Sequence, residues 1–135
     1  CDKVRVAVSN TLDFNKERPR SVFLCNTDSL GEAIQRASPK ARVVKALNTM
    51  WCGHMVNPRL LPESRHTFQS SNDAAAKEAV RGILRQFGWK DEEVVDLGDL
   101  STARGTEAVL PLWVRLYMAR KSGAFNFRIV TAPAS

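Results

Sequence analysis

The chain has 135 residues, 44% of them hydrophobic and 25% charged, with a formal net charge of +6. These values are typical of one soluble domain, or part of one, and exclude a low-complexity or disordered chain. The basic residues are dispersed and form no run interleaved with aromatics, so we do not expect nucleic-acid binding. An anionic cofactor or substrate accounts for the positive charge, as does a solvated surface.

The cysteines and the apolar segments indicate where the protein works. The three cysteines form no C-x-x-C pair, a pattern typical of a reduced, cytoplasmic protein. The longest apolar stretch, Ala108–Met118, contains a proline and an arginine and is too short to cross a bilayer. No signal peptide is recognisable at the start. We therefore expect a cytoplasmic protein that does not act in a membrane.

The first 40 residues predict a strand, a loop and a helix. Alternate valines over residues 4–8 predict a strand that ends at Ser9-Asn10. The polar stretch Thr11–Arg20 predicts an exposed loop, followed by a short apolar piece. Ser29 begins an S-x-x-E capping box, which predicts the start of a helix that stops before Ser38-Pro39.

The middle of the chain continues this alternation. Arg42–Leu47 predicts a second strand, and Asn48–Pro62 predicts a long loop or a broken helix. His66–Ser70 predicts a third strand. The clearest helix is Ala74–Phe87, with Asn72 or Asp73 as its N-cap and Gly88 after its end.

The last third predicts a strand, a long helix and a final strand. Glu93–Leu97 is the fourth strand-like run. Ser101–Lys121 predicts one long apolar helix that is kinked or split at Pro111, because proline removes a helical hydrogen bond. Phe125–Val130 alternates apolar and polar residues and predicts a last strand.

Alternating strands and helices predict an α/β fold with a mostly parallel sheet and helices on both faces. A Rossmann half also needs a G-x-G-x-x-G loop to hold the pyrophosphate of a dinucleotide. The chain has 7 glycines, and no two are spaced to make that loop. We therefore expect residues 1–135 to form a single domain that is an incomplete, Rossmann-like C-terminal portion of a larger reductase.

Six short motifs follow one another along the chain. They lie at Val43–Thr49 (VVKALNT), Ser71–Lys77, Phe87–Trp89, Asp96–Glu107, Leu112–Leu116 and Phe125–Arg128. Their residues and order, from about residue 3 to residue 130, resemble the NADP oxidoreductase family associated with the deazaflavin coenzyme F-420. The resemblance implies hydride transfer between NADP (or NAD) and a deazaflavin or another small acceptor.

The resemblance also implies where the nicotinamide lies. Open α/β sheets bind ligands at the carboxyl ends of their parallel strands. Here two such ends carry polar residues, Ser9-Asn10-Thr11 and Asn48-Thr49. Asn48 and Thr49 are the candidate catalytic residues, and Asn48 joins the first strand end as a candidate cofactor contact. Asn10 and Asn48 could instead only cap the turns that follow their strands.

Four further residues are candidate contacts of the acceptor. Met50 and Trp51 could wall an acceptor pocket or pack the loop onto the sheet. Arg104 and Glu107, three residues apart on one helix face, are expected to form a structural ion pair, or else to contact cofactor or acceptor.

Three remaining features bear on metals and partners. Cys52, His54 and His66 lack the paired ligand spacing of a zinc site, so no metal is expected. The apolar face around Leu112, Trp113, Leu116 and Tyr117 predicts a homodimer interface or simple core packing. The alternative to an oxidoreductase is a non-catalytic, truncated reductase that serves as a binding or dimerisation module.

Overall fold

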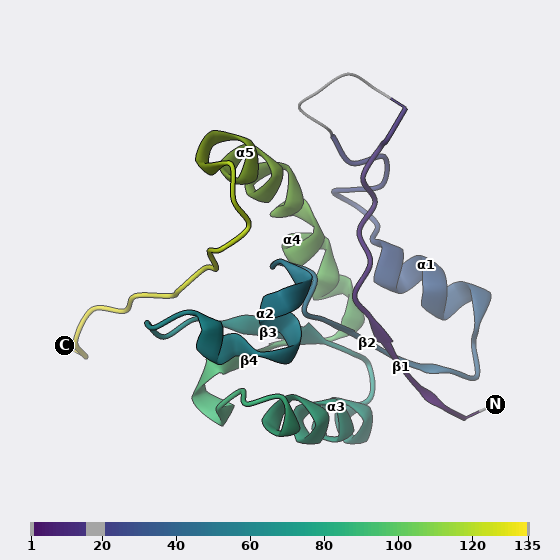
Figure 1. Ribbon diagram of the computed structural model, residues 1–135. Coiled ribbons are helices and arrows are strands. Elements are labelled where there is room, and N and C mark those ends of the chain that lie inside the picture. Colours follow the sequence, from purple (N-terminus) through teal and green to yellow (C-terminus); the bar gives the residue numbers. More distant parts are fainter. Residues whose placement is uncertain (1, 16–20, 135) are drawn as a thin grey trace.

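The computed structural model describes residues 2–15 and 21–134 and contains one four-stranded sheet with helices on both faces. Its strands are β1 (Val4–Ala7), β2 (Arg42–Ala46), β3 (Thr67–Ser70) and β4 (Val94–Gly98), side by side in that order (Figure 1). β1 pairs with β2 and β3 with β4 in parallel, whereas β2 and β3 are antiparallel. The prediction of a mostly parallel α/β sheet is confirmed.

The antiparallel pair follows from how the chain connects the strands. β1 reaches β2 through α1 (Leu30–Ala37), and β3 reaches β4 through α3 (Ala74–Gln86), so each pair is linked by a helical crossover. Between β2 and β3 lie only the short helix α2 (Cys52–Val56) and a 3-10 turn, Pro58–Leu60. This connection stays at one end of the sheet, and the chain must return in the opposite direction.

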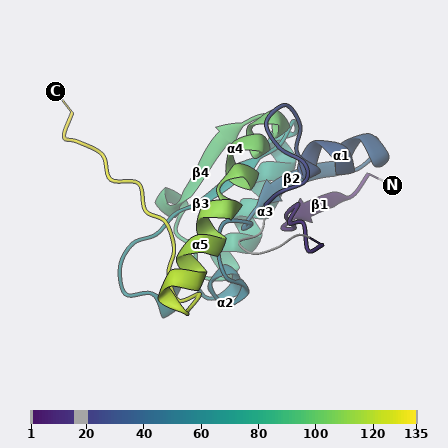
Figure 2. The same ribbon diagram turned by 90° about the horizontal axis from the view of Figure 1, so that it is seen from above.

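Each face of the sheet has its own apolar cluster. Val44 and Ala46 of β2 pack with Val80 and Leu84 of α3 on one face. Val43 packs on the other face, against a cluster that includes Ala7, Ala41, Leu100 and Ile34. Figure 1 shows α3 below the sheet and α1 and α4 (Ala103–Ala108) above it, and Figure 2 looks down onto α4 and α5 (Leu110–Arg120). The expected covering of both faces is confirmed.

Two helix starts form as the sequence predicts. The Ser29 hydroxyl accepts a hydrogen bond from the Glu32 amide at 3.1 Å and donates to the Glu32 carboxylate at 2.7 Å. Asp73, the second of the two candidate caps, accepts from the Ala76 amide at 2.8 Å. Gly88 follows α3 with a φ of +98°, the left-handed backbone that glycine tolerates.

The long C-terminal helix is split, as predicted. α4 ends at Ala108 and α5 begins at Leu110, one residue before Pro111. Proline has no N–H to donate to the carbonyl of Glu107 four residues earlier, so the helical ladder is interrupted at this point.

The prediction of a last strand at Phe125–Val130 is wrong. The segment has no strand, although the amide of His66 donates to the carbonyl of Phe127 at 3.0 Å. The next bond breaks the ladder, because Ile129 donates its amide to the His66 ring at 3.0 Å instead of to backbone. Phe125 of this segment packs on a helix, with its ring centroid 5.4 Å from that of Trp113.

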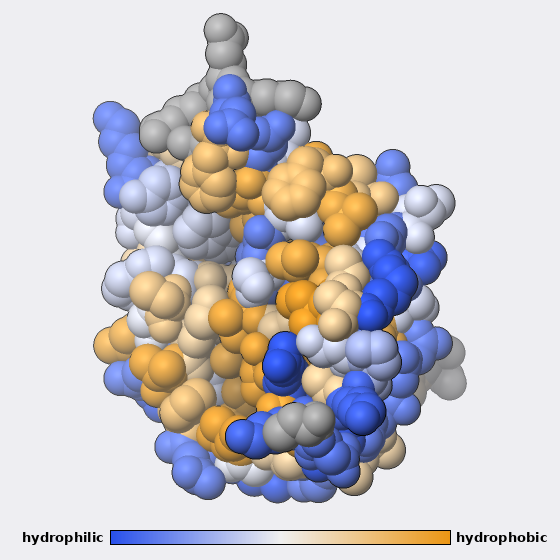
Figure 3. All heavy atoms as spheres, turned by 90° about the vertical axis from the view of Figure 1, so that its right-hand side faces the viewer, coloured by the Kyte–Doolittle hydropathy of each residue, from blue (hydrophilic) through white to orange (hydrophobic). Residues whose placement is uncertain are grey.

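The edges of the molecule complete the fold. Residues 16–20 of the expected loop lie outside the described residues, and its flanks pair through an antiparallel bridge between Leu12 and Val22. β1 is an edge strand of the sheet, and its valine Val6 and the following Val8 are 38% and 41% exposed. Figure 3 views the molecule from this side and shows apolar surface across the middle of the face. In the described part of the chain, no helix combines the length and apolarity that a membrane crossing requires.

Candidate functional site

The carboxyl ends of β1 and β2 meet at one edge of the sheet, because these strands are parallel neighbours. The side-chain amide of Asn10 donates to the carbonyl of Asn48 at 3.0 Å. In return, the Asn48 amide donates to Oδ1 of Asn10, also at 3.0 Å. The structure thus brings the two strand ends together. The pair is also a structural tie between two turns, the other role that the sequence left open.

Asn48 is the buried member of the pair. It is 3% exposed, and it donates a further hydrogen bond to the carbonyl of Thr106 in α4 at 3.1 Å. Its Oδ1 accepts no hydrogen bond from the described residues, and the Thr49 hydroxyl is buried without a partner there. Ser9 is exposed and Asn10 half-buried, so these two residues form the accessible rim above Asn48.

Thr11, the last polar residue of the first strand end, is fully buried and already occupied. Its hydroxyl donates to the carbonyl of Leu24 at 3.0 Å. This bond ties the β1 end to the segment that precedes α1. Thr11 therefore supports the turn in which Ser9 and Asn10 lie.

The turn after β2 contains a strained residue. Leu47 has a φ of +63°, in the left-handed region that a leucine side chain disfavours. Such a conformation costs on the order of 1 kcal/mol or more and is concentrated at functional sites. Leu47 immediately precedes Asn48, so the strained backbone lies in the turn that sets the direction of the Asn48 side chain.

A buried ion pair lies beneath the two strand ends. Lys45 of β2 and Glu107 of α4 are 1% and 3% exposed, and their charged groups are 2.9 Å apart. Lys45 also donates to the carbonyl of Ser9. Burial lowers the pKa of the Lys45 ammonium, and the Glu107 carboxylate partly offsets this effect. Lys45 thereby links the β1 end to α4.

Glu107 also closes the start of α1. Its carboxylate accepts the amides of Leu30 at 2.7 Å and Gly31 at 3.1 Å, two of the donors that a helix N-terminus leaves unpaired. A side chain on Gly31 would approach Leu100 to 3.3 Å, so glycine lets α1 come this close to the neighbouring turn.

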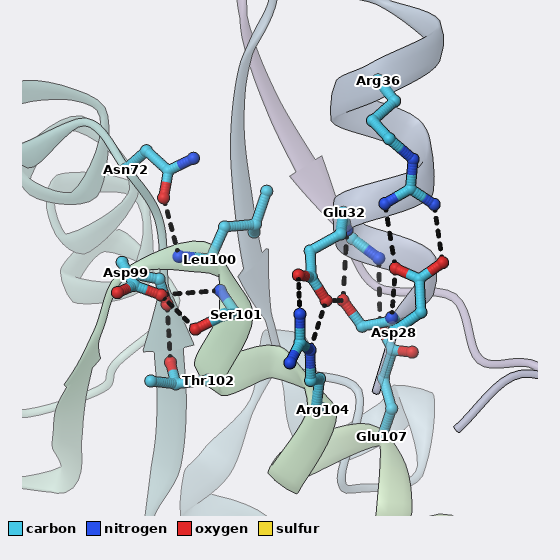
Figure 4. A network of polar contacts seen from close by, with 12 residues as sticks. Asp28, Glu32, Arg36, Asn72, Asp99, Leu100, Ser101, Thr102, Arg104 and Glu107 are labelled. Atoms are coloured by element: carbon cyan, nitrogen blue, oxygen red, sulfur yellow. Dashed lines mark hydrogen bonds and ion pairs between the residues drawn. The ribbon is translucent and has the colours of Figure 1, made fainter. Parts of the chain in front are cut away.

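The expected ion pair between Arg104 and Glu107 does not form. Arg104 instead makes two hydrogen bonds to Glu32 of α1, at 3.0 and 2.7 Å (Figure 4). The Arg104 guanidinium lowers the pKa of the Glu32 carboxyl, which the Ser29 hydroxyl also helps to hold charged. Both residues therefore bind α1, which offers the Glu32 carboxylate to Arg104 and its open N-terminus to Glu107.

Met50 and Trp51 occupy different environments. Met50 is 6% exposed and belongs to the apolar core, and the Asn126 amide lies 3.8 Å from its sulfur. Trp51 is 46% exposed and lies edge-on to the His54 ring, with centroids 5.4 Å apart. It also covers Gly123, where an added Cβ would lie 3.2 Å from the indole side chain. Of the two residues, Trp51 is therefore the one that presents an exposed ring.

Glu107 is a candidate from the sequence, whereas Lys45, within the VVKALNT motif, is not. A lone charged residue inside a strand of apolar neighbours is the signal that could have found it. Residues 2–15 and 21–134 contain no cluster of three or more histidine, cysteine or acidic side chains able to hold a metal ion.

Comparison with known proteins gives a strong structural likeness. The chain superposes with a TM-score of 0.91 and 46% identity on a protein from Arthrobacter sp. FB24 described as a candidate F420-dependent NADP-reductase. The match covers 96% of this chain and 58% of that protein. A hypothetical protein from Sinorhizobium meliloti matches 74% of the chain with a TM-score of 0.53 and 29% identity, over 46% of its own length.

No family model matches the chain, and no curated protein matches it either. The resemblance to the NADP oxidoreductase family associated with coenzyme F-420 is nevertheless confirmed, because it is now supported by fold as well as by motifs. The chain spans just over half the length of the Arthrobacter protein.

Proposed function

We propose that this chain, which resembles the F-420-associated NADP oxidoreductases over nearly its whole length, forms the nicotinamide side of such a reductase. In this role it would hold the nicotinamide of NADP, or of NAD, for hydride transfer to or from a small acceptor. The likeness to the Arthrobacter protein supports the reaction class, and the joined ends of β1 and β2 support the location.

The observation that carries the proposal is a pair of polar atoms without protein partners. Asn48 Oδ1 and the Thr49 hydroxyl both lie at the β2 end, with no hydrogen bond to the described residues. A nicotinamide carboxamide has an NH₂ group that suits an amide oxygen and a carbonyl that suits a hydroxyl donor. The residues present therefore fit the group that the resemblance implies.

The main task of the protein in this reaction is to position the reactants. The nicotinamide, when bound, supplies or receives the hydride, and no acid or base of the protein is required. Ser9 and Asn10 would bind at the rim, and Asn48 and Thr49 would orient the carboxamide. Lys45 and Glu107 keep the two strand ends in place from below. Fixed orientation and exclusion of water are the protein's contributions.

The acceptor is proposed to lie on the Trp51 side. Trp51 offers an exposed aromatic face beside the strand ends, which suits a flat heteroaromatic acceptor such as a deazaflavin. Met50 would contribute by supporting Trp51 from the core. Arg104 and Glu107 are engaged with α1, so in this proposal they support the site without touching the acceptor.

The test is steady-state kinetics of NADPH oxidation by the protein that carries this chain. Asn48→Ala should lower kcat about tenfold while changing the KM for NADPH less than twofold, because the phosphate contacts lie elsewhere. Asn57→Ala is the matched control, since Asn57 is exposed and its side chain caps nothing. An unchanged kcat in Asn48→Ala would overturn the proposed role.

A homodimer is also proposed, through the helix α5. Leu112 and Tyr117 are 53% and 47% exposed, although both belong to an apolar helix face. The Tyr117 ring stacks on Trp113 with centroids 5.6 Å apart, so the exposed face is continuous with the packed aromatic cluster. A second copy of the chain would bury this face by pairing like with like.

A further inference from the structure

A basic cavity lies beside Trp51 and belongs to no part of the proposed nicotinamide site. It has a volume of about 320 Å³ and lies between the loop that precedes β3 and the segment that follows α5. Its lining includes Glu63, Arg65, Arg120, Asn126 and Arg128. Three arginines thus face one carboxylate, and the cavity is large enough for a charged group of a small molecule.

Two of the three arginines are almost free of counter-charges. Arg128 is 51% exposed and approaches Glu63, itself 85% exposed, no closer than 4.0 Å. Arg120 makes no ion pair or hydrogen bond within residues 2–15 and 21–134. Other arginines of the molecule are paired at short range, such as Arg104 with Glu32 at 2.7 Å. The cavity therefore carries excess positive charge.

Arg65 adds a buried donor without a partner. Its side chain is 3% exposed, and its Nε has no hydrogen-bond acceptor among the described residues. The Arg65 guanidinium shares the single carboxylate of Glu93 with Arg59, so one negative charge serves two positive ones. Burial and the neighbouring Arg59 charge both lower the pKa of Arg65. A buried N–H of this kind is costly unless an acceptor reaches it.

The cavity lies close to the candidate acceptor residues Met50 and Trp51. Asn126, in its lining, lies 3.8 Å from the sulfur of Met50, and Gly123 lies against Trp51. Because β2 and β3 are antiparallel, the residues that precede β3 lie at the same end of the sheet as the residues that follow β2. A molecule held against Trp51 could therefore extend a charged group into the cavity.

We propose that the cavity lined by Arg65, Arg120 and Arg128 is an anion site that binds a phosphate or carboxylate group of the acceptor. Guanidinium groups bind both kinds of oxyanion through charge-assisted hydrogen bonds. The assignment to the acceptor rests on the proposed function, whereas the anion site itself rests only on the cavity and its arginines. The site would select acceptors that carry an acidic tail.

The first experiment measures anion binding by the purified chain. Inorganic phosphate and, separately, citrate are titrated at constant ionic strength while the arginine Nε–H signals are followed by NMR. The Arg65 signal should shift with a saturable, millimolar dependence. Arg120→Gln combined with Arg128→Gln should weaken the affinity at least tenfold. A preference for one of the two probes distinguishes a phosphate from a carboxylate ligand.

The matched control is Arg115→Gln. Arg115 is exposed on α5, outside the cavity lining, and bonds only the carbonyl of Pro111 on its own helix. Anion binding should be unchanged in this variant. No saturable shift of Arg65 in the parent chain, or equal weakening by Arg115→Gln, would overturn the proposal.

A second experiment separates the anion site from the proposed function. In NADPH oxidation, the Arg120→Gln, Arg128→Gln variant should raise the KM for an acidic acceptor about tenfold, with kcat and the KM for a neutral acceptor unchanged. If the protein binds phosphate but catalyses no hydride transfer, the anion site stands and the proposed function is wrong. If hydride transfer occurs but the KM for the acceptor does not depend on the acceptor's charge, the proposed function stands and the assignment of the anion site to the acceptor is wrong.

Discussion

Lys45 and Glu107 hold together four parts of the molecule that are separate in sequence. Through them the end of β1, the strand β2 and the start of α1 share one buried network with α4. A charge buried at this depth is tolerated only when its partner and its hydrogen bonds are complete. The network is therefore sensitive to the loss of either charge.

Glu107→Gln should lower the free energy of unfolding by about 3 kcal/mol, because it leaves the Lys45 ammonium buried without a counter-charge. Adding Lys45→Met should recover at least half of that loss, since the second change removes the uncompensated charge. Urea unfolding of both single variants and the double variant gives the coupling energy.

Additive effects of the two substitutions would contradict this account. Arg104→Gln is a useful comparison, because its pair with Glu32 is 39% and 16% exposed. Partly exposed pairs contribute about 1 kcal/mol or less, so this variant should be clearly milder.

At the scale of elements, the break before α5 decides which helix residues are covered. α4 contributes the buried Thr106 and Glu107 to the site, whereas Leu110 is the one buried residue among those of α5. Pro111 marks this boundary, since it interrupts the helical hydrogen bonds. α5 thus projects an apolar face, on which Phe125 packs against Trp113.

The α5 dimer can be tested with two matched substitutions. Leu112→Lys should raise the dimer dissociation constant at least tenfold, because it places a charge in the proposed apolar interface. Met118→Lys is the control, since Met118 is 44% exposed but lies on a different face of the helix. Sedimentation velocity over a concentration series measures both, and equal effects of the two variants would rule out this interface.

The strand predicted at Phe125–Val130 is absent because its side chains and its backbone follow different partners. Alternation over Phe125–Val130 predicted a place in the sheet, but alternate aromatics also suit a segment that packs on one side of a helix. The His66 ring accepts the hydrogen bond of the Ile129 amide, which in a sheet would donate to a neighbouring strand. Periodicity indicates which side chains are covered, not which backbone covers them.

For the whole molecule, the missing glycine-rich loop leads to a measurable expectation. These 135 residues contain no G-x-G-x-x-G sequence, and most dinucleotide affinity comes from the pyrophosphate contacts that such a loop makes. A millimolar complex already requires about 4 kcal/mol, whereas each nicotinamide-side hydrogen bond contributes about 1 kcal/mol. Titration calorimetry with this chain should therefore give a Kd for NADPH in the millimolar range or weaker.

Nicotinamide mononucleotide provides the control for that titration. It lacks the adenosine half, so its affinity should be within a few-fold of that of NADPH if only the nicotinamide side is bound. Micromolar binding of NADPH by this chain would contradict the expectation and would indicate a phosphate site elsewhere in the molecule.

Elements that local chemistry controls could be predicted from the sequence. Caps at Ser29 and Asp73, a glycine after α3 and the proline near the start of α5 act within a few residues, so their outcomes could be predicted. The motif order was enough to indicate the family. The meeting of Asn10 with Asn48 was also predictable, because parallel neighbouring strands end at the same edge.

The pairing of charges and aromatic groups, in contrast, depends on how the helices pack in three dimensions. Arg104 and Glu107 bind α1 rather than each other. Lys45 pairs with Glu107, which is 62 residues further along the chain (107 − 45). The cavity of Arg65, Arg120 and Arg128 joins two segments that the sequence keeps far apart. Such contacts depend on where α1, α4 and the final segment pack, and that packing is set by the whole core rather than by any local pattern.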